Sequence, residues 1–165
     1  MNMFCARNRN RGKKILQTQR GAAAVEFAIL LPFLVVLVFG IIEFGLLLYN
    51  QQVITNASRE GARAAIVGDC DHRLTDAQIG QIVTDYCVYT DTSGNTRRRL
   101  ITFNTTNNPP STTVTPSPKD CILTVGQDVE VRVDYNYTFL VPSILGFGPT
   151  KLLRARTVMK MESAP

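Results

Sequence analysis

The sequence predicts an α+β fold, with a long N-terminal transmembrane and stalk helix followed by a small antiparallel sheet covered by helix. Hydrophobic residues fill 23 of the 28 positions from 22 to 49, which predicts a membrane segment. Two later segments, 129–137 and 153–161, alternate apolar and polar side chains as strands do. A sheet with one apolar face needs a helix to cover that face.

A short, flexible and basic leader occupies residues 1–21. Positions 1–20 carry six basic residues and no acid, so the net charge of +5 divides into +6 here and −1 over the remaining 12 basic and 13 acidic residues. A nucleic-acid-binding protein needs its cations on a folded face among base-reading side chains, so this distribution argues against that class. The positive-inside rule instead predicts that the leader stays in the cytoplasm.

Residues 22–49 are the predicted transmembrane helix. This run exceeds the roughly 20 apolar residues that a bilayer core requires, and no small-x-small cleavage site follows it, so it should remain as an anchor. Pro32 predicts a kink or a local weakening of the helix. Glu43 lies 21 residues after Ala22, about 32 Å along a helix at ~1.5 Å per residue. We expect it near the outer interface, as a structural or interfacial acid or as a subunit contact.

The helix is expected to continue as a stalk over residues 50–67, a segment without proline. Small or apolar residues recur there at helical spacing and would let another helix approach closely. Because a helix from 22 to 67 cannot bury itself, we expect other helices to cover this stripe. The stripe consists of Val53, Ala57, Gly61 and Ala64.

Residues 68–165 are the predicted α+β domain. After a turn at 68–73, Thr75 and Gln78 form a capping box that opens a second helix, which runs to about Cys87. The apolar side of that helix includes Leu74, Ile79, Ile82, Val83 and Tyr86.

A variable loop is expected over 88–120, interrupted by a possible strand at 99–103. Its segment 107–118 is too rich in Pro and Thr to pack. We expect residues 122–125 to join the two alternating segments in the sheet, and the apolar stretch 139–149 to connect those two strands.

Three cysteines, Cys70, Cys87 and Cys121, fall in the predicted periplasmic part, where the environment is oxidising. Cys70 and Cys87 flank the second helix, so Cys121 is expected to pair with one of them. We favour Cys87–Cys121, which would stabilise the domain by about 3–4 kcal/mol in the chain-entropy model. The leftover thiol could make an intermolecular bridge.

The boundary between leader and helix carries the most informative pattern, Gly21 followed by Ala22 and, four residues later, Glu26 and Phe27. A cut after Gly21 would create an amino group at Ala22, one helical turn from Glu26. A bare carboxylate in the hydrocarbon region costs ~2.5 kcal/mol or more, so it is retained where it gains a partner. That partner would be its own amino terminus or that of a neighbouring subunit.

These residues resemble a type IV prepilin processing site. More closely, residues 20–67, which include Gly40-Ile-Ile-Glu-Phe-Gly and Asn56-Ala-Ser-Arg-Glu-Gly-Ala-Arg, resemble the TadE-like family of the tight-adherence (Tad/Flp) pilus system. By position, the resemblance implies that Gly21 and Ala22 flank the cleavage site. It also implies that Glu26 assists processing or assembly and that Phe27 completes the recognition pair.

The resemblance further implies a minor pilin or pseudopilin without enzymatic activity, needed for pilus assembly and surface adhesion. Such a protein spans the bacterial inner membrane once, with a cytoplasmic N-terminus and a periplasmic C-terminal domain. Its implied partners are a prepilin peptidase, other pilin-like subunits and the Tad secretion platform. We expect no cofactor, no nucleic acid and no small-molecule substrate.

Two alternatives compete with this interpretation. The first is an uncleaved, signal-anchored periplasmic binding or scaffold domain. The second is a membrane-tethered thiol enzyme that uses Cys70 and His72. Adjacent residues in one turn cannot all point at one metal ion, so we expect a polar turn there and no metal site.

Overall fold

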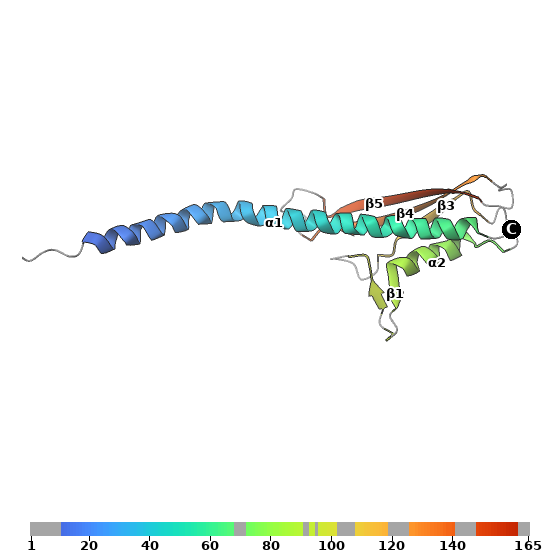
Figure 1. Cartoon of the computed structure of the whole chain (residues 1–165), viewed down its shortest axis with the longest axis horizontal. Helices are drawn as coiled ribbons and strands as arrows, with labels where there is room; N and C mark the ends of the chain where they lie inside the picture. The colour runs from blue at the N-terminus through green and yellow to red at the C-terminus, as the bar shows by residue number, and fades with distance from the viewer. Residues whose placement is uncertain are drawn as a thin grey trace, which may run out of the picture. The chain divides into compact units, whose positions relative to one another are not determined.

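A computed structural model describes residues 11–67, 72–90, 93–94, 96–101, 108–118, 126–140 and 148–161, with the side chains of 11–20, 89–90 and 96–97 excepted. The chain divides into two compact units, Met1–Ile41 and Ile42–Pro165. The predicted α+β class is confirmed, because one long apolar helix precedes a small antiparallel sheet and a short helix (Figure 1).

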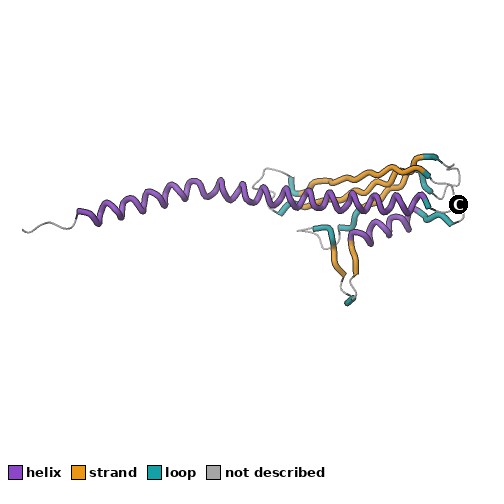
Figure 2. Tube along the Cα trace, in the orientation of Figure 1, coloured by secondary structure: helices purple, strands orange, loops and turns teal. Residues whose placement is uncertain are grey.

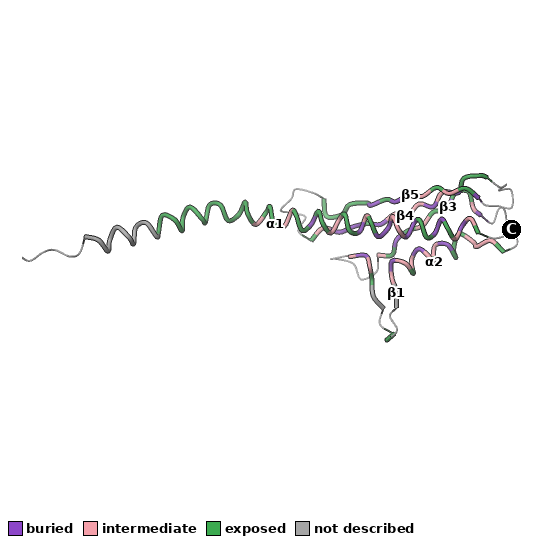
Figure 3. The backbone as a smooth tube through the Cα atoms, in the orientation of Figure 1, coloured by how far each residue is buried: buried purple, intermediate pink, exposed green. Residues whose placement is uncertain are grey.

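Helix α1 spans Arg11–Ile66, so it begins well before the predicted start at residue 22. The leader was expected to be flexible, yet its second half contains Lys, Leu, Gln and Arg and no proline, and these residues favour helix. The helix continues through Pro32. In the first unit, none of the side chains described from 21 to 41 is buried (Figure 3).

The sheet of the second unit contains three antiparallel strands in the order β3-β4-β5. Figure 2 draws strands in orange. Strand β4 spans Asp128–Thr138 and β5 spans Thr150–Lys160, so the two alternating segments are confirmed as strands. Their pairing puts Tyr137 opposite Lys151 and Asp128 opposite Lys160.

The third strand, β3, spans Ser111–Thr115 and pairs with β4. This corrects the prediction that 107–118 does not pack. Thr is β-branched and suits a strand, and prolines are tolerated just outside a short edge strand. Within β3, Val114 is buried opposite Val131. The strand expected at 122–125 lies outside the described residues.

Helix α2 spans Asp76–Cys87, as its capping box predicted. The backbone N–H of Gln78 donates to Thr75 Oγ1 at 3.3 Å, and Thr75 N–H donates to Gln78 Oε1 at 2.9 Å. These two bonds satisfy backbone donors at the start of the helix. The buried side of α2 includes Ile79, Val83 and Cys87.

Strands β1, Val88–Thr90, and β2, Thr96–Arg98, form a separate two-stranded hairpin. The strand expected at 99–103 is therefore wrong where the structure describes it, since residues 99–101 follow β2 without strand structure. The reason is a turn toward the core: Leu100 is buried, and the Arg99 guanidinium stacks on the Tyr86 ring at 4.5 Å.

The core lies between the sheet and the second part of α1, with α2 packed beside them (Figure 1). Alternate residues of β4 point into it. At Gly61 the helix α1 lies close to its neighbours, because a Cβ there would lie 2.7 Å from Cγ2 of Val83 and 3.3 Å from Cγ1 of Val131. The buried aliphatic and aromatic residues that β4 contributes are Val129, Val131, Val133, Tyr135 and Tyr137.

Replacing Gly61 with alanine tests this packing. Overpacking costs about 1–3 kcal/mol and the better helix propensity of Ala returns about 1 kcal/mol, so Gly61→Ala should lower the free energy of unfolding. Val83→Ala in the same chain should relieve the clash. Gly45→Ala is the control, because nothing lies within 4 Å of its new Cβ. Urea unfolding of the full chain in detergent measures the difference, and equal stability of the two glycine variants would contradict it.

Candidate functional site

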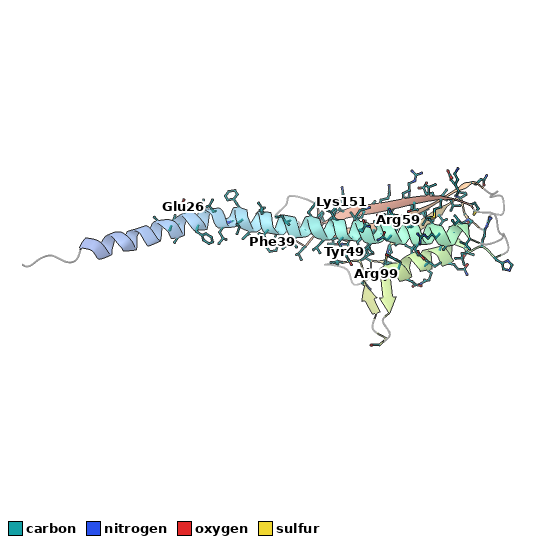
Figure 4. The ribbon with its side chains drawn as sticks, viewed as in Figure 1. Glu26, Phe39, Tyr49, Arg59, Arg99 and Lys151 are labelled. Atoms are coloured by element: carbon teal, nitrogen blue, oxygen red, sulfur yellow. The ribbon has the colours of Figure 1, made fainter. Side chains whose placement is uncertain are left out.

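The predicted processing residues lie on the exposed first part of α1. Gly21, Ala22, Glu26 and Phe27 are all exposed, and a Cβ at Gly21 would meet nothing within 4 Å. Figure 4 shows Glu26 on this part of the helix, and Phe27 is 60% exposed. The segment is therefore open to a protein that would bind or cleave it.

The helix that carries these residues is long and apolar enough to cross a membrane over Gly21–Ile66. Most of its large apolar side chains from 25 to 42 are exposed, Phe33 to 73% and Ile41 to 66%. An apolar surface of this extent is typical of contact with lipid or with other helices.

Burial on α1 begins at Glu43, whose side chain is only 3% exposed. Its carboxylate accepts a hydrogen bond of 2.5 Å from the Tyr137 hydroxyl and bonds of 3.1 and 3.0 Å from the Leu140 N–H. The ring of Phe139 packs edge-on against Tyr137, with centroids 5.3 Å apart. We call this set, Glu43, Tyr137 and Leu140, the carboxylate dock.

The dock holds the end of β4 against α1. Burying a carboxylate lowers stability unless the carboxylate is hydrogen-bonded. Here one hydroxyl and one backbone N–H donate to it. Burial, together with the bond to Glu43 and its charge, raises the pKa of Tyr137 above its ordinary value. The hydroxyl therefore stays protonated and remains a donor over the physiological range. The sequence predicted a structural role or a subunit contact for Glu43, and the structure shows a contact within the chain.

A second polar contact follows two helical turns later at Asn50, which is fully buried. Its Nδ2 donates to the carbonyl oxygens of Leu46 and Ile101 at 3.1 and 3.2 Å, and its Oδ1 accepts from the Ile101 N–H at 2.8 Å. The Tyr135 hydroxyl donates to the same Ile101 carbonyl at 3.3 Å. These hydrogen bonds hold the segment after β2, which contains Ile101, against α1.

Two contacts join α1 to β5. Gln51 Nε2 donates to the Arg154 carbonyl at 2.9 Å, and the hydroxyls of Ser58 and Thr157 lie 2.7 Å apart. Sequence reasoning did not single out Asn50 or Ser58. The signal that could have found them is their spacing, because Glu43, Asn50 and Ser58 recur at seven or eight residues and so share one face of the helix.

The stripe of small residues packs inside the chain. Val53, Ala57 and Gly61 are buried in the core, and Ala64 is half-buried. The helix that approaches Gly61 closely is α2 of the same chain. This corrects the expectation that the stalk cannot bury itself and depends on other helices. The charged residues of the stalk, Arg59, Glu60 and Arg63, are exposed.

Cys87, which we predicted to pair with Cys121, is a buried free thiol in the structure. Burial raises its pKa to about 11, against a smaller opposing effect of the Arg99 charge. Such a thiol is protonated at neutral pH and is a poor nucleophile. The favoured Cys87–Cys121 bridge is therefore not formed in the structure. Cys121 and Cys70 themselves lie outside the described residues.

Among the described residues, no group of three or more His, Cys, Asp or Glu side chains could hold a metal ion. His72 is exposed, and its proposed partner Cys70 is outside the described residues. The contacts that the structure does bring together, from Glu43 to Ser58, position the domain on the helix.

Residues 21–63 match the family model of the TadE-like proteins. The resemblance found in the sequence is thereby confirmed over a segment that includes the processing residues, the carboxylate dock's Glu43 and the stripe up to Gly61. No curated protein and no solved structure matches the chain.

The carboxylate dock can be tested by a double-mutant cycle. Tyr137→Phe leaves the buried carboxylate with one donor fewer and should lower the free energy of unfolding by about 1–3 kcal/mol. Glu43→Gln removes the charge, and the double variant should lose less than the sum of the two single variants. Tyr135→Phe is the matched control, because its 3.3 Å bond to a neutral carbonyl should be worth less.

The contribution of Tyr137 to the free energy of unfolding should decrease at alkaline pH. Because the Tyr137 pKa is raised in the folded chain, the folded state holds its proton longer, and stability should fall as the pH rises above about 10, the ordinary tyrosine pKa. Tyr137→Phe should reduce this alkaline loss, to which Cys87 also contributes through its raised pKa of about 11. Urea unfolding at stepwise pH measures the change. An additive double variant with an unchanged alkaline slope would show that Glu43 and Tyr137 do not interact.

Proposed function

We propose, taking the TadE-like match over residues 21–63 as the premise, that the chain is a minor pilin or pseudopilin of a Tad/Flp pilus system. It spans the bacterial inner membrane once, with the basic leader in the cytoplasm and the folded domain in the periplasm. It takes part in pilus assembly and thereby in surface adhesion, and it has no enzymatic activity. The observation that carries the proposal is this match on a helix with an exposed apolar surface.

Processing occurs after Gly21 and is performed by a prepilin peptidase. The scissile bond lies within α1, and glycine there favours local opening, since Gly inside a helix costs roughly 0.5–1 kcal/mol relative to Ala. Removal of the leader takes away six basic residues and leaves a mature chain with a net charge of −1. The new amino terminus at Ala22 then lies one turn from Glu26 and can pair with a carboxylate of the same or a neighbouring subunit.

Assembly uses the part of α1 that the domain leaves uncovered. Residues 22–42 have no buried side chain, whereas one face from Glu43 onward is occupied by the chain's own sheet. Helices of other pilin-like subunits, held by the secretion platform, would therefore pack first against 22–42. Glu26 lies in this part and would set the axial register of such packing.

The processing step is tested on the membrane-extracted protein by N-terminal sequencing and intact mass. We expect a mature start at Ala22 in cells with an active prepilin peptidase, and Gly21→Ala should abolish it and reduce pilus-dependent adhesion. Gly45→Ala is the matched control, because this glycine also lies in α1 with open space around it. An intact Met1 terminus would favour an uncleaved, signal-anchored scaffold instead.

The role of Glu26 needs a separate comparison. Glu26→Gln should reduce pilus-dependent adhesion, whereas Glu60→Gln should leave it unchanged, because Glu60 is an exposed acid on the same helix beyond the segment proposed to pack. Normal adhesion in the Glu26→Gln variant would contradict the proposed role of Glu26 in setting the axial register. It would not contradict the proposed cleavage after Gly21.

A further inference from the structure

The end of the sheet that docks at Glu43 carries exposed apolar side chains. Leu140 is 41% exposed and Leu152 is 47% exposed. Leu140 bonds Glu43 through its own N–H. Leu152 follows Lys151, which lies opposite Tyr137 in the β4–β5 register. Both leucines therefore belong to the sheet end that the carboxylate dock fixes on α1.

Helix α1 exposes apolar side chains beside the dock as well. Phe44 is 61% exposed and Leu48 is 50% exposed, and both follow Glu43 within two turns. These residues belong to the second unit, together with the sheet. We call Phe44, Leu48, Leu140 and Leu152 the apolar collar.

We propose that the apolar collar contacts the lipid of the outer face of the inner membrane, so that the domain rests on the bilayer. This inference depends on the single-pass orientation proposed above. Glu43 lies about 32 Å along the helix from Ala22 at ~1.5 Å per residue, and the hydrocarbon core is about 30 Å thick. The collar therefore begins where the hydrocarbon ends.

The charges near the collar suit a lipid boundary. The Glu43 carboxylate obtains its hydrogen bonds from Tyr137 and Leu140, so it does not depend on water for them when lipid lies beside it. Lys151 lies beside Leu152 and is exposed (Figure 4). A lysine in that position can bury its stem against apolar groups and place its ammonium among headgroup phosphates.

A tryptophan reporter tests the contact, because the chain contains no tryptophan. Leu152→Trp is compared with Val158→Trp, which replaces a residue of similar exposure, 45%, on the same face of β5. The two positions are six residues apart, about 20 Å at ~3.3 Å per residue. The full chain is reconstituted in phosphatidylcholine–phosphatidylglycerol vesicles, with or without bromines on the upper acyl carbons.

We expect the bromines to quench most of the fluorescence of Leu152→Trp and to leave that of Val158→Trp nearly unchanged. Adding Glu43→Gln should release the sheet end and reduce the quenching at 152, whereas adding Glu60→Gln should not. Leu140→Trp provides a second reporter if the first variant does not fold. Equal quenching of 152 and 158, or shielding of 152 that appears only when other pilus proteins are added, would overturn the proposal.

Failure of this inference and failure of the proposed function are distinguishable. Resistance to alkaline carbonate extraction reports membrane integration without reference to the collar. A chain that is extracted by carbonate would contradict the single-pass proposal. A chain that resists extraction but shows no quenching at 152 would contradict the collar alone.

Discussion

The burial of one face of α1 from Glu43 onward is the constraint on which the rest of the structure depends. A carboxylate at 3% exposure is tolerated only with hydrogen-bond donors, and its donors come from Tyr137, 94 residues away, and from Leu140. Asn50 and Ser58 repeat the arrangement along the same face. Between these polar contacts the face is apolar or small, so the sheet and α2 can approach the helix closely. The polar contacts fix the register, and the apolar contacts supply most of the burial.

This constraint divides the helix into two surfaces with different uses. None of residues 21–42 is buried and most of them are exposed, so their apolar side chains suit lipid or the helices of other subunits. From Glu43 to Ala65, one face of α1 packs against the chain's own domain. The second compact unit begins at Ile42, one residue before Glu43, so the division coincides with the start of the carboxylate dock. In the proposed pilin, the first surface would be available for assembly while the second holds the domain.

The parts of the fold that local chemistry determines could be predicted from the sequence. The capping box of Thr75 and Gln78 placed the start of α2, and the alternation of apolar and polar residues placed β4 and β5. What depends on partners far along the chain could not be predicted. Strand β3 is short and polar, and it exists as a strand because it pairs with β4. The periodicity of the small-residue stripe identified the buried face of α1 but not what covers it. We therefore expected a neighbouring helix there, whereas the chain's own sheet and α2 cover it.

The claim that α1 packs on its own sheet can be tested most directly by a cysteine cross-link between Ser58 and Thr157, whose hydroxyls lie 2.7 Å apart. In cells that assemble pili, the double variant Ser58→Cys with Thr157→Cys should oxidise within one chain. The measurement is peptide mapping by mass spectrometry without reduction, applied to monomeric and dimeric bands. A 58–157 bridge confined to the monomer is the predicted result. A bridge between these positions found only in dimers would contradict the account, because the stalk would then pack on a neighbouring subunit.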